Sequence, residues 1–156
     1  MKRLAAALFG LFLLAFAVFE AVKYGGVVIP LVVLGFVLPD FAFFAAIGTP
    51  SEKGRLPRRA VPLYNLLHHW SLPAVVLVLS ATLPISHATL LLFFPAALAW
   101  LAHIMLDRAL GYGLRTRDGW QRGGSPVNRP AAGSHQTWSS TRRMLPPSTL
   151  PISSSE

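Results

Sequence analysis

Three ionisable side chains lie close together near the end of the last apolar stretch of the chain, in the run WLAHIMLDRALGYGL at residues 100–114. His103 and Asp107 are four residues apart, which puts both on one face of a helix, and Arg108 follows directly. Imidazole nitrogens and carboxylate oxygens bind Zn²⁺, Mn²⁺ and Fe²⁺, and a guanidinium pairs with phosphate oxygens. The run therefore carries candidate metal ligands beside a candidate catalytic residue, Arg108, that would engage a phosphate.

Residues of the same chemical types occur in two other apolar stretches. Asp40 lies in one, and Asn65 and His68 lie three residues apart in the other, on a shared helix face. An ionisable side chain at membrane depth is costly and usually faces a partner or a cavity. We therefore expect one polar cluster, with candidate ligands Asp40, His68, His103 and Asp107 and with Asn65 and Tyr112 in support.

The apolar stretches are those of a membrane protein. Hydrophobic residues make up 53% of the 156 positions and the mean hydropathy is +0.52, values too high for a soluble domain of this size. Four segments cover residues 4–22, 27–47, 63–83 and 88–106, each near the roughly 20 residues that cross a bilayer. No alternating pattern suggests a barrel, so we expect an all-α bundle of four transmembrane helices. Four prolines in or near these segments predict kinks rather than breaks: Pro30, Pro39, Pro73 and Pro95.

Positive charges fall almost entirely on one side of the four segments. They precede the first, separate the second from the third and follow the fourth, whereas the other two connections carry only Lys23. This asymmetry predicts that both termini and the middle loop are cytoplasmic, in a bacterial inner membrane. The basic groups would line the anionic lipid head groups, which accounts for the net charge of +8 without a nucleic-acid partner.

This orientation places the polar residues at related depths. At 1.5 Å per residue, Asp40 lies about 10 Å, His68 about 8 Å and His103 about 5 Å from the cytoplasmic ends of their segments. Asp107 falls at the cytoplasmic edge. A cluster of this kind can be a divalent metal site, a proton or ion relay, or a set of hydrogen bonds that only hold helices together.

Several enzyme classes are excluded by what the sequence lacks. There is no cysteine, and hence no disulfide, thiolate metal site or cysteine nucleophile. His103 and Asp107 are separated by three residues, whereas the box of membrane acyltransferases has four between its histidine and aspartate. Asn65 stands where a desaturase-type His-x-x-His-His box would need a histidine before His68 and His69. Walker, zincin and nucleophile-elbow motifs are also absent.

The two ends of the chain differ from the apolar core. Residues 1–3 and the first segment resemble a secretory signal, but the run is long and Phe19-Glu20-Ala21 is a poor cleavage site, so we interpret it as a span. From residue 116 the chain is rich in Ser, Pro, Gly and Arg without an apolar period. We expect a four-helix domain over residues 1–115 and a disordered cytoplasmic tail over 116–156.

The polar residues also occur in a recognisable pattern. VLPD, PLYNLLHHWSLP and AHIMLDRALGYGL resemble the small bacterial membrane family called domain of unknown function 4260, over roughly residues 1–124. The matching positions are Pro39, Asp40, Tyr64, Asn65, His68, Pro73, His103, Ile104, Asp107, Arg108, Gly111, Tyr112, Gly113 and Leu114, with Arg115 in place of a lysine. The chain departs from the family pattern in three places: an Arg-x-Glu-Gly opening is absent, the Gly-Tyr step after Pro-Asp is weak, and the Thr-His-Leu-Gly close is replaced. The resemblance implies a four-helix membrane fold and supplies no activity.

Three functional hypotheses follow. The first is metal-assisted hydrolysis of a lipid-linked or membrane-proximal substrate, with Zn, Mn or Fe bound by the four candidate ligands. The second is a small ion or proton transport protein, which would be a homo-oligomer because four short helices enclose little space. The third is a structural membrane subunit whose polar groups only join helices.

Overall fold

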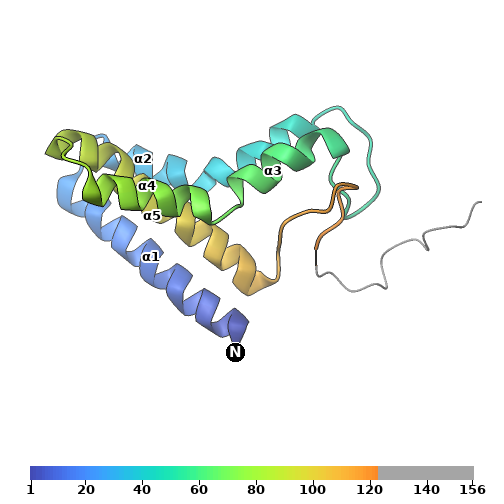
Figure 1. Cartoon of the computed structure of the whole chain (residues 1–156), viewed down its shortest axis with the longest axis horizontal. Helices are drawn as coiled ribbons and strands as arrows, with labels where there is room; N and C mark the ends of the chain where they lie inside the picture. Colours follow the sequence, from blue (N-terminus) through green and yellow to red (C-terminus); the bar gives the residue numbers. More distant parts are fainter. Residues whose placement is uncertain (123–156) are drawn as a thin grey trace, which may run out of the picture. The chain divides into compact units, whose positions relative to one another are not determined.

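The computed structural model describes residues 1–122, and the regular secondary structure in this range is helical (Figure 1). The helices are α1 (Lys2–Tyr24), α2 (Val28–Val37), the 3₁₀-helices η1 (Leu38–Ala46) and η2 (Arg58–Ala60), α3 (Val61–Leu67), α4 (Ser71–Thr82) and α5 (His87–Leu110). Four stretches are long and apolar enough to cross a membrane: Lys2–Tyr24, Val28–Ala46, Arg58–Thr82 and His87–Leu110. The predicted bundle of four transmembrane helices is confirmed, and each end lies within five residues of the predicted end.

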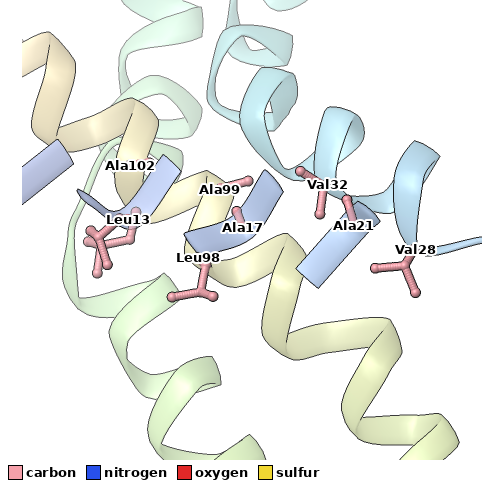
Figure 2. Packing of buried hydrophobic residues seen from close by; sticks show 9 residues of the cluster. Leu13, Ala17, Ala21, Val28, Val32, Leu98, Ala99 and Ala102 are labelled. Carbon is pink, nitrogen blue, oxygen red and sulfur yellow. The ribbon is translucent and has the colours of Figure 1, made fainter. Parts of the chain in front are cut away.

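The centre of the bundle is made by small side chains. Leu13, Ala17 and Ala21 of α1 face Leu98, Ala99 and Ala102 of α5, with Val28 and Val32 of α2 beside them (Figure 2). We call these eight residues the small-residue core. In lipid, close contact between backbones drives helix association, because the surrounding acyl chains are as apolar as leucine. The backbones of α2 and α5 lie very close together at Gly35, since a methyl group added there would overlap the carbonyl oxygen of Ala96 on α5.

Two of the four spans change their helical geometry near a proline. The second passes from α-helix to 3₁₀-helix at Leu38, next to Pro39, which has no N–H to donate. The third is interrupted between Leu67 and Ser71, before Pro73, so the expectation of a kink without a break was wrong for this span. The break frees backbone carbonyls, and α5 supplies their donors.

Two side chains of α5 satisfy the carbonyls at this break. Trp100 Nε1 donates to the oxygen of Leu67 at 2.8 Å, and Arg108 Nη2 donates to the oxygen of His68 at 3.1 Å. Buried carbonyls without a partner would be costly in a membrane, where no water replaces the lost bond. The third span is therefore broken at a point that the fourth span stabilises.

The chain after α5 turns back onto the loop before α3. Gly111 ends α5 in the left-handed conformation, with φ of 93°. Beyond it, Arg115 and Gln121 form an isolated β-bridge, and the oxygen of Gly119 accepts a hydrogen bond from the Leu56 N–H at 3.0 Å. The compact chain thus extends past the expected boundary at residue 115. The part of the predicted tail from residue 123 onward lies outside the described residues.

Candidate metal site

Side chains from three helical segments meet at one point. Asp40 comes from η1, His68 from the end of α3 and His103 from α5, and one ligand atom of each lies within 4.8 Å of the other two. Asp40 Oδ1 is 3.7 Å from His103 Nε2. Asp107 Oδ2 is 3.7 Å from the same nitrogen and 3.6 Å from His68 Nε2. The structure thus brings the four candidate ligands into one cluster, which we call the His/Asp cluster.

Three separations within the cluster, each between a histidine and an aspartate, suit ligands of a shared ion better than hydrogen bonds. Nitrogen and oxygen atoms that share a proton lie about 2.7–3.2 Å apart. Two ligands bound to one Zn²⁺ at about 2.0–2.2 Å in tetrahedral geometry lie about 3.3–3.6 Å apart. The distances of 3.6 and 3.7 Å are close to the second value.

Both histidines present an unpartnered nitrogen to this point. His68 Nε2 and His103 Nε2 are buried and have no hydrogen-bond partner within residues 1–122. A buried polar atom without a partner costs about 1–3 kcal/mol, so such atoms are uncommon unless another group completes the site. The donor set and the two free nitrogens therefore fit a divalent metal ion.

His68 is held in the orientation of a metal ligand. The carbonyl oxygen of Tyr64 lies 3.0 Å from His68 Nδ1, and the same oxygen accepts from the His68 backbone N–H at 2.9 Å. With the proton on Nδ1 donated to this carbonyl, the lone pair of Nε2 points to the cluster. The Tyr64 ring also stacks on the imidazole, with 3.8 Å between centroids. Local helix geometry thus fixes both the tautomer and the ring plane.

The cluster is closed around the histidines and open at one carboxylate. The side chain of His68 is 3% exposed and that of His103 is 10% exposed, with the Phe36 ring edge-on to His103 at 5.2 Å. The exposed fraction rises to 22% for Asp107 and to 51% for Asp40. A small molecule would therefore reach the cluster beside Asp40.

The three segments hold their residues at similar distances from the helix ends. With a rise of 2.0 Å per residue in η1, Asp40 lies about 12 Å from Ala46. With 1.5 Å per residue, His68 lies about 10 Å from Val61 and His103 about 10 Å from Leu110. The sequence estimate placed His103 shallower because it ended the fourth segment at residue 106, whereas α5 continues to Leu110.

The supporting polar residues lie around the cluster. Arg108 donates from Nη1 to the oxygen of Tyr112 at 3.2 Å and from Nη2 to the oxygen of His68. Asn65 exchanges two hydrogen bonds with the backbone of Arg115, at 2.9 and 2.7 Å. The Tyr112 side chain is exposed, so its contribution here is its carbonyl oxygen. Arg108 acts in this structure as a clamp between chain segments, and its binding of a phosphate stays a prediction.

Sequence reasoning missed three polar side chains that join these elements. Trp100 was taken as part of an apolar span, yet its indole N–H bonds across to α3. Arg59, a basic residue of the middle loop, donates to the oxygens of Ala45 and Ile47 at the end of η1. Gln121 donates to the oxygen of Gly111 at 2.6 Å. Each of these side chains donates to a backbone carbonyl at or near a helix end. The sequence indicates that such carbonyls need donors, but which side chain donates depends on tertiary contacts.

The comparisons with known proteins assign a family without an activity. A family model described as Domain of unknown function (DUF4260) matches residues 3–123 of the chain. No curated protein and no solved structure matches it. The matched range contains every residue of the His/Asp cluster.

Proposed function

The chain belongs to the family described as Domain of unknown function (DUF4260), and we propose that it is a metal-dependent membrane protein whose His/Asp cluster binds one divalent transition metal ion. The observation that carries the proposal is the pair of buried, unpartnered Nε2 atoms of His68 and His103. Each lies 3.6 or 3.7 Å from Asp107, the spacing of two ligands on one ion. Hydrogen bonding between helices alone would leave neither nitrogen without a partner.

The donor set indicates which metals are candidates. Two imidazole nitrogens with carboxylate oxygens suit Zn²⁺, Fe²⁺ and Mn²⁺. Structural zinc sites are fully enclosed by four protein ligands, whereas catalytic sites keep one position open. The half-exposed Asp40 gives the cluster such an open side.

A metal in this place supports a hydrolytic reaction. A bound divalent ion activates water and polarises a carbonyl or phosphoryl oxygen. His68 and His103 would bind the ion from the closed side, and Asp107, which lies near both imidazoles, would be a third ligand. Asp40 would complete the coordination or orient the attacking water at the open side. We therefore propose metal-assisted hydrolysis of an ester or phosphoester as the reaction class.

The proposed setting is the inner membrane of a bacterium, with the termini and the middle loop in the cytoplasm. The basic residues before α1, before α3 and after α5 support this orientation. They would contact anionic lipid head groups, and a homo-oligomer is compatible with the exposed apolar faces of the spans.

Metal analysis of the purified protein tests the proposal. The full chain would be purified in mild detergent, supplied with Zn²⁺, Mn²⁺ or Fe²⁺, and its metal content measured by mass spectrometry. We expect about one ion per chain, lost in His103→Ala and retained in His87→Ala, because His87 is exposed and outside the cluster. An absence of stoichiometric metal in the unmodified chain would contradict the metal site. Proton flux in liposomes that His68→Ala abolishes would then support a relay instead.

A further inference from the structure

We infer that the molecule acted on by this site is a membrane amphiphile that reaches it from within the bilayer, past the exposed face of η1. The inference rests on the proposed metal-dependent function and adds its substrate class and its route of entry. Three features carry it: the position of the open side, the residues around that side, and the cover over α3 by the chain that follows α5.

The open side of the His/Asp cluster lies on a strongly apolar helix. Asp40 is the one charged residue of η1, whose sequence is LPDFAFFAA. Phe41, Phe43 and Phe44 are 40, 42 and 66% exposed, as is Ile47 at 66% directly after the helix. These side chains belong to the second candidate span, where the medium around them is lipid. The carboxylate that opens the cluster is therefore surrounded by residues suited to acyl chains.

The neighbouring helix extends the same surface. α3 packs against η1, and Figure 1 shows the two helices side by side. Leu63 and Leu66 of α3 are 39 and 54% exposed. An acyl chain lying along η1 would thus contact apolar side chains from both helices.

Tyr64 and Asn65 of α3 are covered by the chain that follows α5. Tyr64, which stacks on His68, donates from its hydroxyl to the oxygen of Gly113 at 3.5 Å. The Arg115 guanidinium lies 5.4 Å from the centroid of the Tyr64 ring, and Asn65 holds the Arg115 backbone. This cover closes the approach to His68 along α3. Of the four cluster residues Asp40 has the largest exposed fraction, so we place the entry beside it.

These features select a substrate by its chemistry. A lipid carries its ester or phosphoester bonds where the acyl chains meet the head group, so its chains could lie along η1 while the bond reaches Asp40. Hydrolysis adds one water across that bond and releases an acid and an alcohol, without any further co-reactant. A small water-soluble ester would lack the apolar part that η1 accommodates.

Spin labels test the route of entry independently of any metal or activity. The chain has no cysteine, so Phe41→Cys and Glu52→Cys each give one labelling site in the full protein. In lipid nanodiscs we expect a nitroxide at position 41 to collide with oxygen and to be shielded from a water-soluble nickel chelate. The label at position 52, in the exposed loop before α3, should show the reverse. Equal access of the chelate to both labels would overturn the inference.

Metal-chelating probes test the substrate class. Co²⁺-loaded protein in nanodiscs would be titrated with a long-chain alkyl hydroxamate or with acetohydroxamate, and the visible spectrum of the cobalt recorded. We expect the long-chain probe to change the spectrum at a concentration at least about tenfold lower, and Phe41→Gln to reduce this advantage with cobalt content unchanged. Equal responses to both probes, or an unaltered advantage in Phe41→Gln, would overturn the inference. Absence of the cobalt spectrum would instead contradict the metal site itself.

Discussion

The small-residue core and the region around the His/Asp cluster are stabilised in different ways. In the core, unbroken α1 and α5 contact each other through alanines and leucines, and few polar atoms take part. Around the cluster, a span is broken and one is tightened to a 3₁₀-helix, and side chains bond to the freed carbonyls. Close packing thus provides the fold, and the irregular region provides directed polar groups. Inside a membrane, irregular backbone is tolerated where it is buried in protein or lines a cavity.

The largest effect should come from breaking the core at its tightest contact. In Gly35→Val the new side chain would overlap the Ala96 carbonyl, which the α2 and α5 backbones cannot both accommodate. We expect a loss of about 3 kcal/mol or more in unfolding free energy, measured as thermal stability in detergent. Gly10→Ala is the milder comparison, because the added methyl group there meets the Leu106 side chain at 3.1 Å and its backbone nitrogen at 3.2 Å, contacts that a shift of a few tenths of an ångström relieves. Equal stability of the two variants would show that α2 is not held closely against α5.

The converse experiment removes the cluster and leaves the core. His103→Ala deletes one proposed ligand and leaves the alanine, leucine and valine contacts of the small-residue core in place. We expect metal affinity to fall by more than about 100-fold, read by competition with a chelating dye, with a loss of metal-free stability smaller than that of Gly35→Val, since the deleted ring leaves only a cavity beside Phe36. A large loss of metal-free stability with unchanged metal binding would reverse the assignment of the two regions.

A smaller effect on both properties is expected from the Arg108 clamp. Arg108→Gln removes two donors to backbone carbonyls, one of them on His68 itself. We expect a loss of about 1–3 kcal/mol in stability and a 10- to 100-fold loss in metal affinity, because His68 would no longer be held against α5. If Arg108 instead binds substrate phosphate alone, metal affinity should stay at the level of the unmodified protein.

The smallest effect is expected from removing the Trp100–Leu67 hydrogen bond at the break in the third span. Trp100→Phe removes only the donor to the Leu67 oxygen and should cost about 1 kcal/mol in unfolding free energy. Trp70→Phe is the control, since that side chain is 57% exposed and no side-chain hydrogen bond is found for it in residues 1–122. A loss in Trp70→Phe as large as in Trp100→Phe would mean that the indole N–H does not stabilise the break.

The difference between the two regions also explains what the sequence could predict. The spans follow from apolar runs of a fixed length, which the bilayer thickness imposes on any helix. Asp40, His68 and His103 could be grouped because charge asymmetry predicts the direction of each span and the rise per residue then predicts how far each residue lies from its span end. Their distances from the helix ends in the structure agree with these estimates within about 5 Å.

The break in the third span was not predictable in the same way. Pro73 signals a disturbed helix, but whether it kinks or breaks depends on donors elsewhere in the chain that can satisfy the freed carbonyls. Trp100 and Arg108 are those donors, and they lie 33 and 40 residues beyond the oxygens they bind. Likewise, residues 116–122 have the composition of a tail, yet Gly119 allows a backbone contact with Leu56 that a larger residue would prevent.

X-ray absorption spectroscopy of the zinc-loaded protein tests the central claim most directly. It reports the type, number and distance of the ligand atoms and the characteristic scattering of coordinated imidazole rings. The account predicts two imidazole nitrogens and at least one carboxylate oxygen at about 2.0–2.2 Å, and no stoichiometric zinc at these ligands in His103→Ala. A zinc spectrum without imidazole scattering, or with the same number of imidazoles in His103→Ala, would contradict the assignment of the His/Asp cluster as the metal site.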